Sequence, residues 1–248
     1  MTDTPVTAAL LVIGDEILSG RTKDKNIGYV AEYLTGLGID LREVRVVPDV
    51  EEEIVAAVNA LRARYDHLFT TGGIGPTHDD ITADCIAKAF GVPIDVDPRA
   101  VEMLLQRIKR EDLNEARLRM ARIPQGADLI ENPISRAPGF RIGNVVVMAG
   151  VPAIMQAMLD NVVPGLVKGV PVTAVTIEAT GLPEGLYAAG LGKIAASHAD
   201  LSIGSYPSYS PGGFTNQIIV RGRDMALLQE AETRIRALLD RLRTERPS

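Results

Sequence analysis

Along the first two thirds of the chain, short apolar runs alternate with longer stretches in which apolar residues recur every three or four positions. Runs of this kind are typical of strands that are covered on both faces of a sheet. They lie at residues 7–13, 41–47, 65–70 and 145–149. The longer stretches have the period of a helix with one buried side; after the first run, Ile27, Val30 and Leu34 fall on one face.

The order of strand followed by helix occurs three times before residue 91. A connection that contains a helix is long enough to return the chain to the starting edge of the sheet, so neighbouring strands run parallel. Such crossovers are right-handed, and they distribute the helices over both faces. The pattern therefore predicts an α/β fold with a mostly parallel sheet between two layers of helices.

The pattern changes beyond Gly165, Gly169 and Pro171, which mark a linker near residues 164–171. The elements predicted after it are strands at Val172–Thr180, Leu201–Tyr206 and Gln217–Arg221, a helix at Glu184–Ser197 and a terminal helix with Leu228, Ala231, Ile235, Leu238 and Leu242 inward. We therefore expect two domains, residues 1–168 and a small α+β domain at 169–248. The second is expected to be accessory, because it is small, has a polar hairpin and lacks clustered carboxylates.

The segment at residues 70–82, T-T-G-G-I-G-P-T-H-D-D-I-T, is the most distinctive in the chain. Three glycines and a proline separate an apolar strand from a helix predicted at Ile81–Phe90, which indicates a tight turn with exposed backbone. Amide groups at such a turn bind phosphates, although a turn without a ligand has the same pattern. Asp79 and Asp80 follow, where they either cap the helix or hold a metal or a proton.

Polar residues also follow the first two strands. They are Gly14, Asp15, Glu16, Ser19 and Asn26 after the first strand and Asp49 after the second. In open α/β sheets, ligands collect beyond the carboxyl ends of the strands, so these residues are candidates for the same site. As alternatives, Asp15 and Glu16 solvate a loop, and Asp24 and Asn26 form a cap pair, with Asn26 in particular capping the helix that starts at Ile27.

Several common site motifs do not fit. A dinucleotide fingerprint needs a third glycine where His78 stands, and a P-loop needs Gly-Lys-Ser/Thr where Pro76 and Thr77 stand. The chain also has no His/Cys set with zinc spacing and no G-x-S-x-G elbow, which excludes zinc hydrolases and α/β-hydrolases. A phosphate loop here must be of another type.

Composition narrows the classes of partner. With a net charge of −6 and a pI near 5.2, the chain lacks the clustered cations that nucleic acid or an anionic membrane requires, so neither is expected. The longest apolar stretch, Val145–Leu159, is broken by Gly150 and Pro152 and does not predict a membrane span. The lack of a secretory signal and the single cysteine, Cys85, predict a cytoplasmic protein.

Residues 70–82, followed by Ala83 and Asp84, resemble the signature of the molybdopterin-binding fold of the MoaB/Mog proteins. Further matches follow in the family's order: G-D-E-I-L-S-G at 14–20, D-K-N at 24–26, V-P-D at 47–49, N-P-I-S-R-A-P-G-F at 132–140 and M-A-G-V-P at 148–152. The set is especially similar to the competence/damage-inducible protein A family. The resemblance implies a three-layer α/β/α MoaB/Mog-like domain and a homo-oligomer, either a dimer or a trimer.

The resemblance also implies roles for residues of these motifs. Asp49 and Asp80 match acidic positions that are functional in Mog-like members, and Gly72, Gly73 and Gly75 match their phosphate-cradling loop. The rest of the expected ligand site consists of Gly14, Glu16, Ser19, Asn26, Thr71, Pro76, Thr77, Asp79, Thr82, Arg136, Pro138, Gly139, Gly150 and Pro152. Arg136 stands with Ser135 where the family usually has Gly-Thr, and it either contacts a phosphate or lies on the surface.

Two functions fit these features. In the first, the loop holds a diphosphate, and a divalent cation (Mg²⁺, Mn²⁺ or Co²⁺) bound by Asp80 with Asp15 or Asp49 activates a water that attacks phosphorus. The resemblance points to ADP-ribose-like nucleotides as substrates, with FAD as another. In the second, the domain binds molybdopterin or adenylyl-molybdopterin without turnover, in molybdenum cofactor biosynthesis. The chain stops before the deamidase domain of longer family members, so that activity is not expected.

Overall fold

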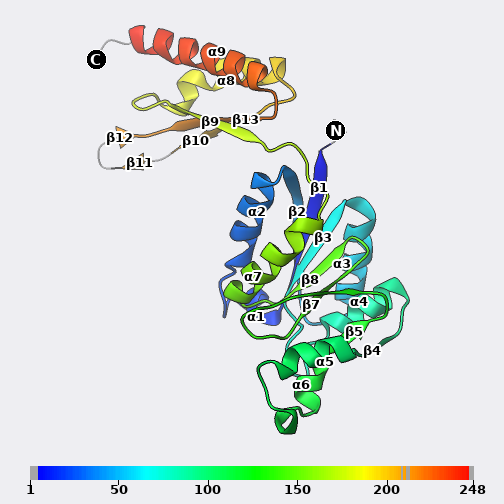
Figure 1. The fold of residues 1–248 in the computed structure, drawn as a ribbon. Coiled ribbons are helices and arrows are strands. Elements are labelled where there is room, and N and C mark those ends of the chain that lie inside the picture. The colour runs from blue at the N-terminus through cyan, green and yellow to red at the C-terminus, as the bar shows by residue number, and fades with distance from the viewer. Residues whose placement is uncertain (1–4, 208, 211–212, 246–248) are drawn as a thin grey trace. The chain divides into compact units, whose positions relative to one another are not determined.

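The computed structural model describes residues 5–207, 209–210 and 213–245. The chain divides into two compact units, Met1–Gly169 and Val170–Ser248 (Figure 1). Separate sheets and separate hydrophobic clusters form the two units. Each unit therefore buries its apolar residues around its own core.

A six-stranded sheet forms the centre of the first unit, with the strand order β2-β1-β3-β8-β7-β6. The strands are β1 (Val6–Ile13), β2 (Ile39–Val47), β3 (His67–Thr71), β6 (Asp128–Ile130), β7 (Gly139–Ile142) and β8 (Val145–Met148). The pairs of β1 with β2, β1 with β3 and β3 with β8 are parallel, whereas β7 and β6 are added antiparallel. The predicted mostly parallel sheet is confirmed.

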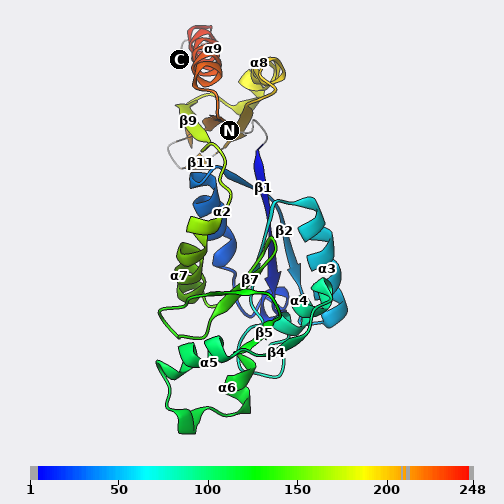
Figure 2. The ribbon, with the colours of Figure 1, turned by 45° about the vertical axis from the view of Figure 1, so that its right-hand side comes forward.

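Helices cover both faces of this sheet (Figure 2). One layer contains α3 (Glu51–Arg64) and α4 (Thr82–Phe90), and the other contains α2 (Asn26–Gly36) and α7 (Pro152–Val162). Successive side chains of a strand point to opposite faces, so Leu11 of β1 packs in the first layer's cluster and Leu10 in the second. The predicted α/β/α layering is confirmed.

Shorter elements connect and extend these layers. Between α4 and β6 lie β4 (Ile94–Val96), α5 (Pro98–Leu105), η1 (Arg110–Asp112), α6 (Glu115–Arg119) and β5 (Arg122–Pro124), and η2 (Val163–Gly165) follows α7. The segment after β1, predicted as a polar loop, contains the one-turn helix α1 (Asp15–Leu18). This turn brings Asp15 and Glu16 back over the end of β2, with which α1 is in contact.

The second unit is a three-stranded antiparallel sheet covered by two helices. Its elements are β9 (Thr173–Glu178), α8 (Glu184–Ser197), β10 (Ser202–Tyr206), β13 (Gln217–Gly222) and α9 (Met225–Thr244), with a short hairpin of β11 (Tyr209–Ser210) and β12 (Gly213–Phe214). The strand order is β10-β13-β9, and both helices pack on one face of the sheet. The predicted α+β character is confirmed; part of the polar hairpin, residues 208 and 211–212, lies outside the described residues.

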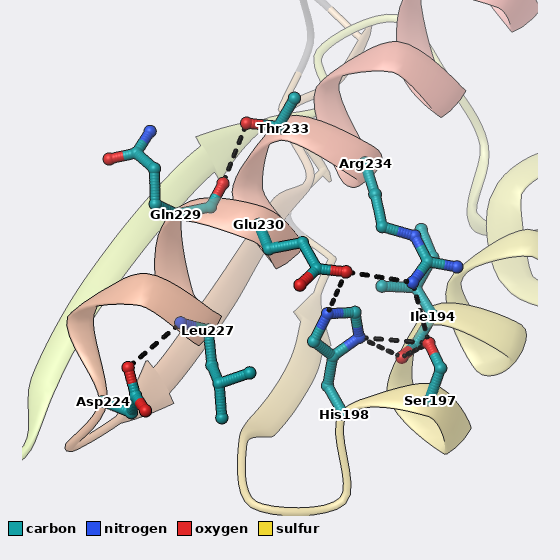
Figure 3. A network of polar contacts seen from close by, with 9 residues as sticks. All are labelled: Ile194, Ser197, His198, Asp224, Leu227, Gln229, Glu230, Thr233 and Arg234. Atoms are coloured by element: carbon teal, nitrogen blue, oxygen red, sulfur yellow. Dashed lines mark hydrogen bonds and ion pairs between the residues drawn. The ribbon is translucent and has the colours of Figure 1, made fainter.

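A buried histidine joins the two helices of this unit (Figure 3). His198 is 4% exposed; its Nδ1 lies 2.9 Å from the carbonyl oxygen of Ile194, and its Nε2 lies 3.5 Å from a carboxylate oxygen of Glu230. Arg234 reaches both Glu230 and the hydroxyl of Ser197. The C-terminal end of α8 is thus tied to α9. No helix within the described ranges is long and apolar enough to cross a membrane.

Candidate functional site

The glycine segment follows β3 directly and turns close to the end of β1. Gly72 and Gly73 have φ angles of +104° and +67°, in the region that favours glycine. A Cβ atom on Gly72 would lie 2.1 Å from the carbonyl oxygen of Ile13, and one on Gly73 would lie 2.1 Å from Oγ1 of Thr82. Residues with a side chain do not fit here, so the bare backbone predicted from the sequence is confirmed.

Buried hydrogen bonds hold the base of this turn. The hydroxyl of Thr82 donates to the carbonyl of Gly72 (3.0 Å), and its N–H donates to the carbonyl of Gly73 (2.9 Å). By contrast, the N–H groups of Gly73, Ile74 and Gly75 have no acceptor in the part of the chain that the structure describes. Consecutive N–H groups without protein acceptors are the arrangement that binds phosphate in nucleotide loops.

Asp80 closes the tip of the loop and does not cap the helix. Its carboxylate accepts hydrogen bonds from the N–H (2.8 Å) and the hydroxyl (2.6 Å) of Thr77. α4 begins at Thr82, and no side chain caps its first turn, so the prediction that Asp79 and Asp80 stand in the helix N-terminus is wrong. The capping alternative fails because the carboxylate of Asp80 accepts from Thr77 and no side chain accepts from the first N–H groups of α4.

Beyond the ends of β1 and β2 lies an acidic depression of about 550 Å³. It is lined by Asp15, Glu16, Leu18, Ser19, Arg21, Asp49 and Asp79. The N–H of Asp15 donates to the carboxylate of Asp49 (3.0 Å), which fixes the start of α1 against the end of β2. The tertiary structure thus brings together carboxylates from three strand ends, as the sequence predicted for Asp15 and Asp49.

The electrostatics of the depression centre on Asp49. Burial raises the pKa of the Asp49 carboxyl, and the negative charges of Asp15, Glu16 and Asp79 raise it further. The hydrogen bond from the N–H of Asp15 opposes this rise. Because the neighbours disfavour its charged form, Asp49 is the carboxylate of this group that gains most from a nearby cation or proton.

A second, smaller pocket lies under the other side of the glycine loop. It has about 10 Å³ of free space, close to the room that one water molecule needs. Its lining includes Gly73, Gly75, Asp80, Arg119, Arg122 and Pro138. Asp15 and Asp80, which were expected to share a metal ion, therefore line different pockets.

No preformed metal site is found in residues 5–207, 209–210 and 213–245, where no three His, Cys, Asp or Glu side chains are placed to hold an ion. Magnesium, however, is usually bound by one or two carboxylates together with substrate phosphates. Asp15 and Asp49 are joined by a hydrogen bond and line one depression beside the glycine loop. These two residues fit a cation that a phosphorylated ligand shares.

Asn26 lies at the start of α2 and faces Gly150. Its side-chain amide donates to the carbonyl of Gly150 (2.8 Å), while its own N–H and that of Ile27 donate to the carboxylate of Asp24 (3.0 and 2.7 Å). Asp24, and not Asn26, is therefore the residue that caps the helix. Oδ1 of Asn26 and Oγ1 of Thr71 are buried without a hydrogen-bond partner among the described residues.

Residues 132–140 form a wall of the smaller pocket rather than of the acidic depression. Arg136 has a φ of +65° and lines neither pocket; its N–H donates to the carbonyl of Asn132 (3.0 Å). Pro138 lines the smaller pocket, and Gly139 is the first residue of β7. Pro152 begins α7, two residues after Gly150. Arg136 thus stands apart from the carboxylates.

Three cations that the sequence did not single out lie beside the loop. Arg21 lines the acidic depression, whereas Arg119 and Arg122 line the smaller pocket. Nε of Arg119 donates to the carbonyl of Asp80 (3.1 Å), and Arg122 pairs with Asp84 at 2.7 Å. The charged stretch before residue 123 was the one sequence feature that could have pointed to Arg119 and Arg122. Its sequence alone, however, does not show that α6 lies next to the glycine loop.

Comparisons with known proteins agree with this geometry. Residues 9–168 match the family model of the probable molybdopterin binding domain. The chain belongs to this family. Residues 173–246 match the model of the FAD synthase middle domain. The MoaB/Mog resemblance drawn from the motifs is confirmed, and the second unit matches a separate family model.

Individual relatives show how far the similarity extends. A protein of Pyrobaculum calidifontis is 39% identical over 168 residues, which cover 65% of this chain and 64% of that protein. A protein of Aeropyrum pernix is 31% identical over 95% of this chain and 92% of its own length. The crystal structure of the protein CinA from Thermoplasma acidophilum is 34% identical and covers 66% of this chain and 100% of that one, with a TM-score of 0.62. The matched region thus spans less than two thirds of some relatives and nearly all of others.

Proposed function

We propose that the first unit is a metal-dependent pyrophosphatase that acts on ADP-ribose-like nucleotides. The observation that carries this proposal is one loop with two kinds of group: three free N–H groups, on Gly73, Ile74 and Gly75, and Asp79, which lines the acidic depression together with Asp15 and Asp49. The N–H groups suit phosphate oxygens, and the carboxylates suit a divalent cation that bridges to them. Asp80 has a positioning role, because its carboxylate holds the loop through Thr77.

In this proposal, some residues of the site bind the diphosphate and the cation, and another accepts a proton. The loop N–H groups and Arg21 hold the diphosphate, while Asp15 and Asp49 hold the cation, which supplies charge neutralisation and a more acidic water when bound. Water adds to one phosphorus, the bridging P–O bond breaks, and two phosphate esters leave. One of the two carboxylates of the depression that are not assigned to the cation, Glu16 or Asp79, accepts the proton of the water.

The similarity of the second unit supports a nucleotide ligand. That unit matches the middle domain of FAD synthase, and FAD is itself a nucleotide with a diphosphate bridge. FAD is therefore the second substrate to examine after ADP-ribose. We expect this chain to work in the cytoplasm, in line with its single cysteine, Cys85.

The decisive experiment incubates the purified chain with ADP-ribose or FAD and with Mg²⁺, Mn²⁺ or Co²⁺. We expect release of AMP with at least one metal, and its loss in Asp49→Asn. Asp95→Asn, on β4, is the matched control, because Asp95 lies outside the acidic depression. Absence of a phosphate-ester product in every combination would refute the pyrophosphatase.

A second function is favoured by one specific observation, the match of residues 9–168 to the probable molybdopterin binding domain. In this case the loop binds molybdopterin or adenylyl-molybdopterin without turnover. A ligand that binds only the folded state raises the unfolding temperature. A rise with pterin phosphates and none with ADP-ribose would support binding without catalysis, and the reverse would argue against it.

A further inference from the structure

The two edges of the first unit's sheet are protected against pairing with another chain. β2 carries Asp40, Arg42, Glu43 and Arg45, and the pairing of β1 with β2 shifts register between Ala8 and Ala9. At the other edge, β6 has three residues. Charged side chains, irregular pairing and short length are the devices by which sheets avoid edge-to-edge association.

The β9 edge of the second unit lacks these devices. No strand pairs with its outer side among the described residues, and its first five residues, Thr173–Ile177, contain no charge and no proline. Its pairing with β13 is continuous, without a register shift. An uncharged, regular strand of this length presents a ready template for another strand.

The pairing of β9 with β13 shows which groups point outward. Ala179 lies opposite Asn216, to whose carbonyl its N–H donates (2.8 Å). Residues opposite each other in an antiparallel ladder alternate between hydrogen-bonded and non-bonded pairs. Val175 and Ile177 therefore bond to β13, whereas the N–H and C=O groups of Ala174, Thr176 and Glu178 point away from it.

One of these outward groups is already engaged. The carbonyl of Glu178 accepts a hydrogen bond from the guanidinium of Arg243 on α9 (3.2 Å). Ala174 and Thr176 remain as the residues that can complete hydrogen-bonded pairs. Ala174 and Thr176 are two residues apart in the strand. When a second copy of the strand is related to the first by a two-fold rotation, Thr176 of each copy therefore lies opposite Ala174 of the other.

We propose that β9 pairs with β9 of a second copy of this chain, which joins the two three-stranded sheets into one six-stranded sheet. In this register Val175 faces its own counterpart on the two-fold axis, and Thr173 faces Ile177. All five facing pairs are uncharged, and Glu178 faces Val172, so no like charges meet. A register centred on Thr176 is excluded, because it requires the carbonyl that Arg243 occupies.

The first test is the molar mass of the full chain in solution, measured by light scattering after gel filtration. Thr176→Pro removes an outward N–H without cutting the bonds to β13, and Thr176→Val is the matched control that keeps this N–H. We expect a dimer for the natural chain and for Thr176→Val, and at least a tenfold weaker dimer for Thr176→Pro. A monomeric natural chain, or a Thr176→Pro dimer of unchanged affinity, would overturn the proposal.

The second test covers the case in which Thr176→Pro does not fold. Facing residues of a non-bonded pair have Cα atoms about 4.5 Å apart, within the usual span of a disulfide. Val175→Cys is therefore expected to form a disulfide-linked dimer on mild oxidation, whereas Thr176→Cys, whose counterpart lies further along the strand, is not. Cys85 is buried and does not interfere. Equal cross-linking of both variants, or none by Val175→Cys, would refute this register.

Discussion

Among the described residues, four side chains of the first unit have a buried polar atom without a hydrogen-bond partner, whereas in the second unit Asn216 has one and the buried histidine has a partner at each ring nitrogen. Among the described residues, Asn26 and Thr71 of the first unit each keep a buried oxygen unpaired. His198 of the second unit contacts Ile194, Ser197 and Glu230 (Figure 3). Unpaired polar groups cost stability, and two of those in the first unit, on Asn26 and Thr71, lie near the glycine loop, where a ligand site would use them.

The backbone differs in the same way. The loop of the first unit needs positive φ angles at Gly72 and Gly73 and close approaches to Ile13 and Thr82. The helices of the second unit begin and end conventionally, with the Asp224 carboxylate accepting from two N–H groups at the start of α9. Two residues of the first unit that must be glycine thus lie in the loop of the candidate site, where bare backbone can approach a ligand.

The largest effect is expected for Gly73→Ala. Its Cβ would lie 2.1 Å from Thr82 Oγ1 at a positive φ, so unfolding of the first unit should become easier by about 3 kcal/mol, with loss of ligand binding. Gly20→Ala is the control, since Gly20 also has a positive φ (+72°) but nothing within 4 Å of a new Cβ. It should cost only about 1 kcal/mol. Equal losses in denaturant titrations would show that the contact with Thr82 is unimportant.

A smaller effect, confined to the second unit, is expected for His198→Ala. The change removes a buried ring and its hydrogen bond to Ile194, which should lower the stability of that unit by about 2 kcal/mol. Calorimetry should show an earlier transition for one unit, with ADP-ribose binding unchanged. In Glu230→Gln, the loss should stay within about 0.5 kcal/mol, because Glu230 is 58% exposed. A loss of binding in His198→Ala would break the separation between the units.

The third prediction concerns two carboxylates with opposite pH behaviour. Because the folded-state pKa of Asp49 is raised, its charge opposes folding above that pKa, and Asp49→Asn should raise stability at pH 7 while turnover is lost.

The pKa of Asp66 is lowered by hydrogen bonds from the N–H and hydroxyl of Thr7. Asp66→Asn should therefore lower stability at pH 7, a contribution that the natural chain loses as acid protonates Asp66. Thermal melts of the natural chain and both variants from pH 3 to 7 measure whether each substitution raises or lowers the unfolding temperature. A lower unfolding temperature for Asp49→Asn at pH 7 would contradict the prediction for Asp49.

The smallest effect is expected for Thr77→Ala. The exposed hydroxyl donates to Asp80, and its loss should cost about 0.5–1 kcal/mol in stability. Thr77→Ser keeps the hydroxyl and should behave as the natural chain. A few-fold weaker affinity for ADP-ribose in Thr77→Ala alone, measured by calorimetric titration, would support the positioning role of Asp80.

Local patterns predicted the elements well where neighbouring residues decide the structure. The helix at Glu184–Ser197 has the predicted bounds, because its apolar period and flanking residues are all local. Predictions about caps were less successful. Of the predicted cap pair of α2, Asp24 bonds to the helix N–H groups while the side chain of Asn26 bonds to Gly150, and Asp80 bonds to Thr77 instead of α4, because both outcomes depend on which groups lie within reach.

By itself, the sequence determined the layers, the mostly parallel sheet, the glycine turn and the gathering of Asp15 and Asp49 at the strand ends. These follow from period, strand order and the lack of a Cβ in glycine, which are properties of the chain alone. The tertiary structure decided that Asp80 lies apart from Asp15, that Arg119 folds back to the loop, and that β9 keeps a bare edge. These depend on distances between residues far apart in the chain, which close packing sets and residue order does not.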